Sequence, residues 1–267
     1  MSGVTALVLA GSRGSADPLA LAEGVSHKAL ISIAGVPMLA RVLRALLKAR
    51  ESGHVGRIAI SIERADILEE LARYGADFTA TPEISVLAAK SSPAASTAAA
   101  VDALGTPLLM TTADHALLQS EWIVHFLQAM PGNMDVGGAI ALEDVVRRAT
   151  PETRRTFLRF SDGAFSGCNL FYLRTPKAQK LAEFWQQLES ERKNPLQLLK
   201  RLGFTFAARY ALGTLSRQDA LNRLREMTGA GGALIEMPFG ECAVDVDKSQ
   251  DLELVRRILE KREGIQA

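Results

Sequence analysis

The chain has 267 residues, a formal net charge of +1 and 48% hydrophobic residues. This length suits one large α/β domain better than two independent ones, and the near-neutral charge excludes an electrostatic case for nucleic acid or an anionic membrane as partner. Two cysteines without C-x-x-C spacing exclude a zinc ribbon and suit a reducing cytosol. Because no apolar run reaches the roughly 18 residues of a membrane span, we expect a cytoplasmic protein with no membrane span.

Apolar runs of strand length alternate with helical patterns through the first half of the chain. The patterns predict strands at 5–10, 57–63, near 77–81 and at 107–114, and helices at 37–50, 65–74, 92–105 and 121–130. This alternation predicts a three-layer α/β/α Rossmann-like fold with a mixed, mostly parallel sheet covered by helices on both faces. Ligands of such sheets bind at the carboxyl ends of the strands, where the turn at 10–14 and Asp114 both fall.

The pattern becomes less regular beyond about residue 135. It predicts strands at 135–144, on both sides of a turn at Asp162-Gly163, and at 232–240. Helical stretches are predicted at 176–191, 195–202 and 216–228, followed by a strand end near 243–247, an acidic turn and a final helix. Paired arginines such as Arg154-Arg155 are interpreted as solvated helix faces.

A glycine-rich turn follows the first predicted strand, and a lone basic residue, Lys28, comes after it. Glycine permits the dihedral angles with which backbone N–H groups can face an anion. Arg13 adds a forked cation, and Lys28 adds a point charge suited to a phosphate oxygen. Neither G-x-x-x-x-G-K-[ST] nor G-x-G-x-x-G is present, so the turn by itself is compatible with an anion site or with a plain connection. The residues of the turn are Ala10, Gly11, Ser12, Arg13 and Gly14.

The fuller pattern, "LVLAGSRG" followed by "HKALISIAGVPMLARVLRAL", resembles the signature of the MobA-like nucleotidyltransferases. Their GT-A-type fold is shared with sugar-phosphate nucleotidyltransferases and A-type glycosyltransferases. The resemblance implies that residues 10–14 wrap the triphosphate of an NTP, while Arg13 and Lys28 neutralise its charge as catalytic cations. Ser12 stands where the family commonly has a second glycine. The implied organisation is a single domain over 1–267, with an NTP-binding half at 1–135 and an acceptor-binding half at 136–267 that includes a helical insertion at 176–229.

Two further segments that resemble the family supply carboxylates. "LLMTTADHALL" places Asp114 at a strand end, where the family carries an aspartate that binds Mg²⁺. A triphosphate attacked at its α-phosphorus needs a hard cation held by carboxylate oxygens. "AVDVDKSQDLELVRRIL" corresponds to an acidic closing motif, and strand alternation would put Asp245 and Asp247 on one face. The resemblance thus implies Mg²⁺ ligation by Asp114 and Asp247, with Asp245 as the second choice; Ala113 and the stretch 248–250 depart from the family pattern.

Other residues are implied to contact the acceptor or the nucleotide. "FSGCNLFYL" matches a segment that lines the acceptor pocket of relatives, so Gly167 and Asn169 are implied to bind the acceptor; a strand with a glycine bulge is the alternative. Relatives present a Ser/Thr-bearing helix start to the nucleotide, which implies the same for Ser96 and Thr97. A helix N-terminus, however, uses such residues in any case.

The resulting hypothesis is a Mg²⁺-dependent nucleotidyltransferase that moves an NMP from an NTP to a small, phosphorylated acceptor and releases pyrophosphate. One alternative is an A-type glycosyltransferase that uses a nucleotide-sugar, although such enzymes show a D-x-D that "ADHALL" lacks. Another is a catalytically silent nucleotide-binding regulatory protein. The sequence decides neither the base, nor the acceptor, nor whether the chain forms a homodimer.

Overall fold

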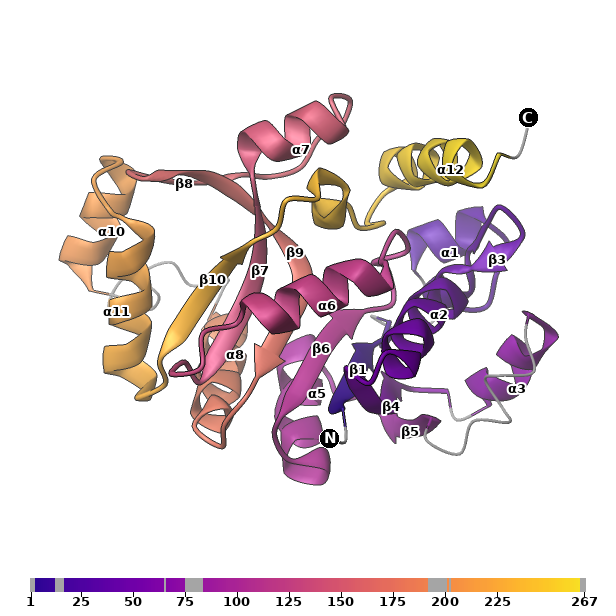
Figure 1. Ribbon diagram of the computed structural model, residues 1–267, viewed down its shortest axis with the longest axis horizontal. Coiled ribbons are helices and arrows are strands. Elements are labelled where there is room, and N and C mark those ends of the chain that lie inside the picture. The colour runs from indigo at the N-terminus through magenta and orange to yellow at the C-terminus, as the bar shows by residue number, and fades with distance from the viewer. Residues whose placement is uncertain are drawn as a thin grey trace.

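The computed structural model describes residues 3–12, 17–64, 66–74, 84–191, 201 and 203–264. One eight-stranded sheet forms its centre, and a two-stranded hairpin lies apart from it (Figure 1). The strands of the large sheet are β1 (Val4–Leu9), β4 (Val55–Ile62), β5 (Ile84–Ala88), β6 (Leu108–Thr112), β7 (Val136–Leu142), β8 (Leu158–Phe160), β9 (Gly163–Leu173) and β10 (Gly232–Glu236). The hairpin consists of β2 (Ser32–Ile33) and β3 (Val36–Pro37).

The strands of the large sheet follow the order β10-β7-β9-β6-β1-β4-β5, with β8 beside β9. Strands β6, β1, β4 and β5 are parallel to one another, and β10 is parallel to β7. Within the large sheet, every described antiparallel pairing involves β9, which runs against β6, β7 and β8. The predicted mixed, mostly parallel sheet is thus confirmed.

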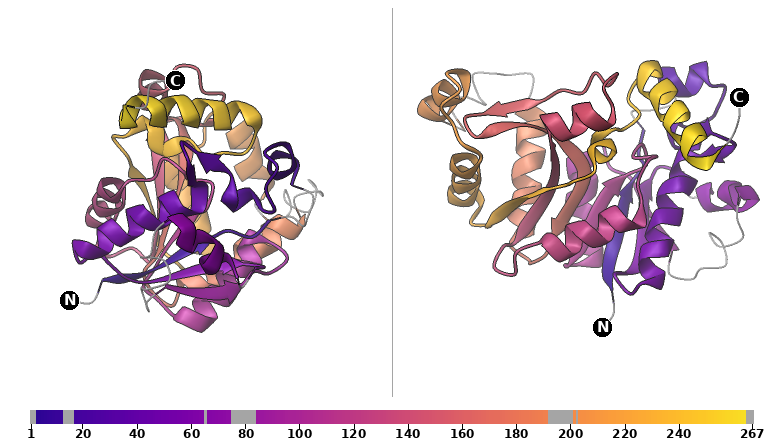
Figure 2. Two further views of the ribbon diagram at one scale, coloured as in Figure 1. Left: turned by 90° about the vertical axis from the view of Figure 1, so that its right-hand side faces the viewer. Right: turned by 45° about the horizontal axis from the view of Figure 1, so that its top comes forward.

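Helices cover both faces of this sheet. Alternate residues of β1 enter two separate apolar clusters, because successive side chains of a strand point to opposite faces. Ala6 and Val8 pack in the cluster that includes α2 (Met38–Glu51) and α6 (Ser120–Ala129). Leu7 and Leu9 pack in the cluster of α5 (Pro93–Leu104) and α8 (Ala178–Glu191). Figures 1 and 2 show these two layers, which confirm the three-layer prediction. The helices are α1 (Pro18–Ala22), η1 (Lys28–Leu30), α2 (Met38–Glu51), α3 (Ile67–Leu71), η2 (Ala72–Tyr74), α5 (Pro93–Leu104), α6 (Ser120–Ala129), α7 (Glu143–Ala149), α8 (Ala178–Glu191), α10 (Phe204–Ala211), α11 (Arg217–Thr228), η3 (Gly240–Ala243) and α12 (Ser249–Glu263).

The last helix returns to the N-terminal part of the chain. In both views of Figure 2, α12 lies at the same end of the molecule as α1. Arg256 of α12 pairs with Glu23, the C-cap residue of α1, and Nη1 of Arg256 lies 3.3 Å from Oε1 of Glu23. This return places the segment before α12 at the carboxyl edge of the parallel strands.

Several predicted elements differ from those found. The strand end predicted near 243–247 is wrong: η3 and irregular backbone occupy this stretch. The strand predicted near 77–81 and most of the helix predicted at 195–202 lie outside the described residues, while β5, α1, α7 and α10 were not predicted. Both α1 and α7 are shorter than two full helical turns, so they show little periodicity. In the described part of the chain, no helix has the length and apolar character needed to cross a membrane.

Candidate active site

Lys28 forms ion pairs with two aspartates that lie far from it in the sequence. Its Nζ is 3.1 Å from Oδ2 of Asp114, 86 residues away, and 3.4 Å from Oδ1 of Asp247, 219 residues away. The side chains of Lys28 and Asp114 are each 21% exposed, and that of Asp247 is 61% exposed. The structure therefore brings three of the predicted site residues together.

Backbone hydrogen bonds position the two aspartates at the carboxyl edge of the sheet. The N–H of Ala113 donates to the carbonyl of Leu9 at 2.9 Å, which extends the pairing of β6 with β1 as far as the residue before Asp114. The carbonyl of Asp114 accepts from the N–H of Val246 at 3.0 Å. This contact ties the C-terminal segment to the end of β6, so that Asp247, the next residue, reaches Lys28.

The charged side chains at this edge could bind both a phosphate, through Lys28, and a cation, through Asp114. Burial opposes the charge of Lys28, but the carboxylates of Asp114 and Asp247 outweigh this effect and raise the pKa of Lys28 above its usual value. Lys28 is therefore protonated. Oδ1 of Asp114 is buried and has no hydrogen-bond partner within the described part of the chain. A buried oxygen left without a partner is costly, and a bound cation would satisfy it.

Mg²⁺ fits this set of donors. The ion commonly binds through one or two carboxylates, with substrate phosphates and water as its other ligands. Asp114 and Asp247 supply two carboxylates, although the described residues hold no group of three His, Cys, Asp or Glu side chains that could bind a metal by themselves. The residues present therefore fit a Mg²⁺ ion that is completed by the phosphates of a nucleotide.

Asp245 has different partners. Arg155 contacts both of its oxygens, through Nη1 to Oδ1 and through Nη2 to Oδ2 at 3.2 Å. Asn169, which has a positive φ of 47° in an irregular part of β9, donates its Nδ2 to Oδ2 of Asp245 at 2.7 Å. The side chains of Arg155 and Asp245 are only 17% and 9% exposed. Asp245 is therefore part of a buried, hydrogen-bonded ion pair.

Burial also affects the titration of Asp245. It raises the pKa of Asp245 to about 6 against the opposing charge of Arg155, and the carboxylates of Asp114 and Asp247 add to the rise. The prediction that Asp245 and Asp247 share one face of a strand is wrong, because their backbone is irregular. Asp247 instead meets Lys28, and Asp245 meets Arg155.

The glycine-rich turn is described up to Ser12, and the predicted residues Arg13 and Gly14 lie outside the described residues. Ala10 donates its N–H to the carbonyl of Ser61 at 2.9 Å. Gly11 does not have a positive φ; a Cβ there would lie 3.1 Å from Cβ of Ala89, so a close approach, and not an unusual dihedral angle, favours glycine. Both the N–H and the hydroxyl of Ser12 donate to Glu63, the residue that follows β4.

Two other predicted residues, Ser96 and Thr97, have local roles in the structure, and a third, Gly167, lies at the surface. Ser96 accepts from the N–H of Lys90 at 2.9 Å, and the hydroxyl of Thr97 donates to the carbonyl of Pro93 at 2.9 Å. Both are buried in α5. Gly167 is exposed in β9, and a Cβ built on it meets nothing within 4 Å. The structure therefore does not place Ser96, Thr97 or Gly167 in contact with Lys28 or its aspartates.

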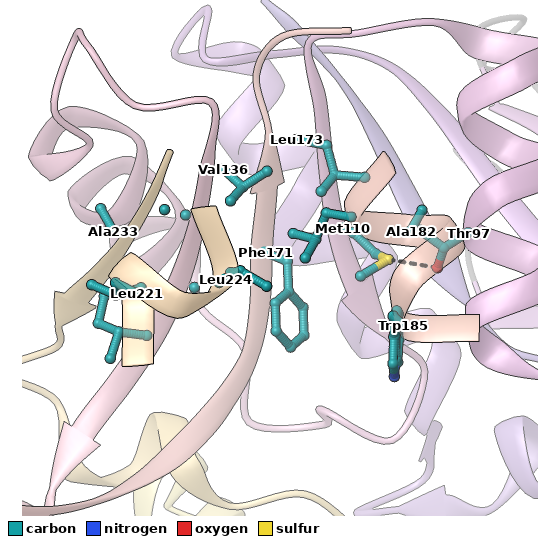
Figure 3. A pocket seen from close by; sticks show the side chains of 15 residues that line it. Thr97, Met110, Val136, Phe171, Leu173, Ala182, Trp185, Leu221, Leu224 and Ala233 are labelled. Carbon is teal, nitrogen blue, oxygen red and sulfur yellow. Dashed lines mark hydrogen bonds between the residues drawn. The ribbon is translucent and has the colours of Figure 1, made fainter. Parts of the chain in front are cut away.

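A separate cavity of about 290 Å³ lies between the sheet and the helices α5, α8 and α11 (Figure 3). Phe171 and Trp185 line it, and Thr97 Oγ1 lies 3.1 Å from the sulfur of Met110 at its edge. None of the residues that line it carries an ionisable side chain. It therefore lacks groups for acid–base or metal chemistry, and the carboxylates with Lys28 remain the candidate site.

Glu63 and Arg155 are the two site residues that the sequence analysis missed. Glu63 directly follows β4, the strand that neighbours β1, and the rule that ligands bind at carboxyl ends of parallel strands could have indicated it. Arg155 was interpreted as part of a solvated helix face, which is wrong: it lies in the connection between α7 and β8 and is mostly buried. No local pattern signals its pairing with Asp245, because the two residues are 90 positions apart.

Comparisons with known proteins identify the family and the fold. A family model described as the MobA-like NTP transferase domain matches residues 6–233, whereas no curated protein sequence matches the chain. A hypothetical transferase from Thermus thermophilus is 26% identical, with a TM-score of 0.77 over 94% of this chain and 100% of its own. A 4-diphosphocytidyl-2C-methyl-D-erythritol synthase from Anaerococcus prevotii is 11% identical, with a TM-score of 0.56 over 97% of this chain and 99% of its own. A putative glucose-1-phosphate thymidylyltransferase from Bacillus anthracis is 12% identical, with a TM-score of 0.55 over 95% of this chain and 94% of its own. At these low identities the last two show a shared fold.

Proposed function

The chain belongs to the MobA-like NTP transferase family and is a nucleotidyltransferase, and we propose that it transfers an NMP from an NTP to a small phosphorylated acceptor with Mg²⁺ as cofactor. The acceptor attacks the α-phosphorus, and pyrophosphate leaves. The observation that carries this proposal is the contact of one protonated lysine, Lys28, with the two carboxylates of Asp114 and Asp247.

The chain's own residues supply charge and position on the NTP side. Mg²⁺, held by Asp114 and Asp247, would neutralise charge that develops on the phosphates. Lys28 donates hydrogen bonds from its ammonium group to phosphate oxygens, and Arg13 of the turn adds a second cation. No covalent enzyme intermediate is needed, because fixed charges and in-line positioning supply the rate enhancement in this kind of reaction.

Asp247 is the better candidate than Asp245 for the second carboxylate ligand. Both oxygens of Asp245 already bind Arg155, and one also accepts from Asn169. Asp247 contacts Lys28 through one oxygen and is largely exposed. In this proposal Arg155 neutralises Asp245, so that the wall on the acceptor side does not repel a phosphorylated molecule.

The acceptor side would include Gly167 and Asn169. The open space next to Gly167 leaves room for a ligand. The amide nitrogen of Asn169 is engaged by Asp245, which leaves its side-chain oxygen to accept from an acceptor hydroxyl. Ser96 and Thr97 remain candidates for the nucleotide side through the backbone at the start of α5. We place the reaction in the cytoplasm, where the free thiols of Cys168 and Cys242 would stay reduced.

Pyrophosphate release tests the proposal. Each of the four NTPs is incubated with Mg²⁺ and a panel of sugar phosphates and small alcohol phosphates, with and without excess EDTA. We expect release that requires one NTP, one acceptor and the metal. Release of a nucleoside diphosphate from a nucleotide-sugar would instead support the glycosyltransferase alternative, and NTP binding without turnover under any acceptor would support the silent regulatory protein.

A further inference from the structure

The carboxylate of Glu63 joins two segments that are separated along the chain. It accepts from the N–H of Ser12, at 3.1 Å to one oxygen and 3.2 Å to the other, and from the Ser12 hydroxyl at 2.5 Å. On its other side, Nε2 of His27 lies 3.1 Å from Oε1. One side chain therefore connects the glycine-rich turn to the segment that carries Lys28.

His27 extends this connection to Lys28. Its Nδ1 accepts from the N–H of Ala29 at 3.0 Å, so the ring carries its proton on Nε2 and donates it to Glu63. The ring is only 4% exposed and caps the short helix η1. Because Lys28 lies between His27 and Ala29, the orientation of the ring also fixes the backbone from which the lysine extends.

Glu63 is negatively charged at neutral pH. Partial burial raises its pKa, but the hydrogen bonds from Ser12 outweigh this effect and hold the pKa below its usual value. A carboxylate beside a triphosphate site has two opposing effects: its charge repels the phosphates, and its hydrogen bonds order the residues that bind them. The Glu63 side chain is 40% exposed, so solvent screens its charge, whereas its contacts to Ser12 and His27 are direct. Ordering is therefore the larger effect.

We propose that Glu63 is a positioning residue for nucleotide binding, which holds Ser12 and the His27–Lys28 segment in place before the NTP arrives. This inference rests on the proposed nucleotidyl transfer. Ordering these segments in advance lowers the entropy that binding must overcome, so Glu63 affects the affinity for the NTP and not that for the acceptor. It also explains the serine at position 12, where the family commonly has glycine: its hydroxyl donates to Glu63.

Calorimetric titration with the four NTPs in the presence of Mg²⁺ tests the inference. For the NTP that binds most tightly, Glu63→Ala should raise the Kd about tenfold, which corresponds to about 1.4 kcal/mol, and leave the acceptor KM unchanged, with circular dichroism as the check that the variant is folded. Glu63→Gln should keep the Kd within about threefold of wild type, because its amide oxygen still accepts from Ser12. Glu69→Ala, at an exposed position on α3, serves as the matched control. A Glu63→Ala variant that binds the NTP as tightly as wild type, or more tightly, would overturn the inference.

Amide hydrogen exchange provides a readout that needs no nucleotide. The N–H groups of Ser12 and Ala29 should exchange faster in Glu63→Ala than in wild type or Glu69→Ala, because the first loses its acceptor and the second depends on the His27 ring. Unchanged exchange at both would show that Glu63 does not hold these segments. If the wild-type chain binds none of the four NTPs, the proposed function fails, and the role of Glu63 in nucleotide positioning fails with it. If the wild-type chain binds an NTP but Glu63→Ala does not differ from wild type, only the assignment of Glu63 is wrong.

Discussion

Nζ of Lys28 lies 3.1 Å from Oδ2 of Asp114, although the two residues are 86 positions apart and belong to a short 3₁₀ helix and a strand end. The pair is mostly buried, and Asp247 adds a second carboxylate from the C-terminal segment. In the proposed reaction, Mg²⁺ would replace Lys28 as the partner of the two carboxylates, and the triphosphate would replace the carboxylates as the partner of Lys28, so that no buried charge would be left unpaired.

Asp114→Asn should abolish turnover while leaving the fold intact. An amide is a weaker ligand for Mg²⁺ than a carboxylate and cannot neutralise its charge, so we expect at least about a 100-fold loss of kcat. Pyrophosphate release and the Mg²⁺ concentration for half-maximal rate measure the effect, with circular dichroism as the check on folding. Asp144→Asn, an exposed substitution on α7, is the control. Full activity in Asp114→Asn would refute its assignment as a metal ligand.

Lys28→Ala should lower kcat/KM by a factor that corresponds to a loss of about 2–4 kcal/mol in transition-state stabilisation. This is the scale for losing one donor that stabilises developing charge. The matched control is Lys48→Ala, because Lys48 is 66% exposed and pairs with Glu121 at the surface. Steady-state kinetics at varied NTP concentration checks the prediction. If both variants show wild-type kcat/KM, Lys28 has no part in the reaction.

Arg155→Leu should destabilise the protein by about 3–5 kcal/mol, because it leaves the buried carboxylate of Asp245 without its cation. The double variant Arg155→Leu/Asp245→Leu should recover much of this loss, since a buried ion pair can often be replaced by apolar side chains. Urea unfolding measures both. Arg148→Leu removes an exposed i,i+4 pair with Asp144 and should cost less than about 1 kcal/mol. Equal losses for Arg155→Leu and Arg148→Leu would contradict the buried ion pair.

Gly240→Ala should destabilise the protein by about 1–3 kcal/mol, whereas Gly167→Ala should leave its stability unchanged. A Cβ at Gly240 would collide with the carbonyl of Val145 and lie 2.7 Å from Cβ of Ala149 in α7, whereas a Cβ at Gly167 meets open space. Thermal unfolding compares the two variants. Steady-state kinetics on the same Gly167→Ala preparation tests its assignment to the acceptor site. A higher acceptor KM with an unchanged NTP KM would support this assignment, and unchanged values of both would contradict it.

Asp135 should stabilise the fold in a pH-dependent manner. It accepts from the hydroxyl of Thr175 at 2.6 Å and from the N–H of Gly231 at 2.8 Å, and these hydrogen bonds hold its pKa below the usual value. A lowered pKa in the folded state adds stability at neutral pH that is lost as the pH falls below about 4, through the folded-state pKa. Asp135→Asn should therefore lower the free energy of unfolding at pH 7, by about 1–2 kcal/mol, and the difference from wild type should shrink at lower pH. A difference that stays constant between pH 7 and pH 3 would contradict this.

Regular and repeated patterns made much of the fold predictable. The strands predicted at 5–10 and 107–114 and the long amphipathic helices agree with the structure, because periodicity is a local property of the chain. The rule that ligands bind at the carboxyl ends of parallel strands placed the start of the glycine-rich turn and Asp114 at one edge of the sheet. The pairing of Asp114 with Lys28, which lies in η1, was not predicted. The short helix α7 and the irregular segment at 244–248 could not be predicted, because tertiary contacts, and not local periodicity, determine them.

The sequence by itself determined the class of fold, the family and the position of the glycine-rich turn, Lys28 and Asp114, because strand alternation and motif spacing are encoded in consecutive residues. Only the tertiary structure decided how Asp245 and Asp247 differ. They are two residues apart, yet one is buried against Arg155 and Asn169 and the other contacts Lys28. The same holds for Glu63, whose contacts to Ser12 and His27 span 51 and 36 positions. Such pairings depend on how β4, β9 and the segment before α12 converge in space, and no local pattern records that convergence.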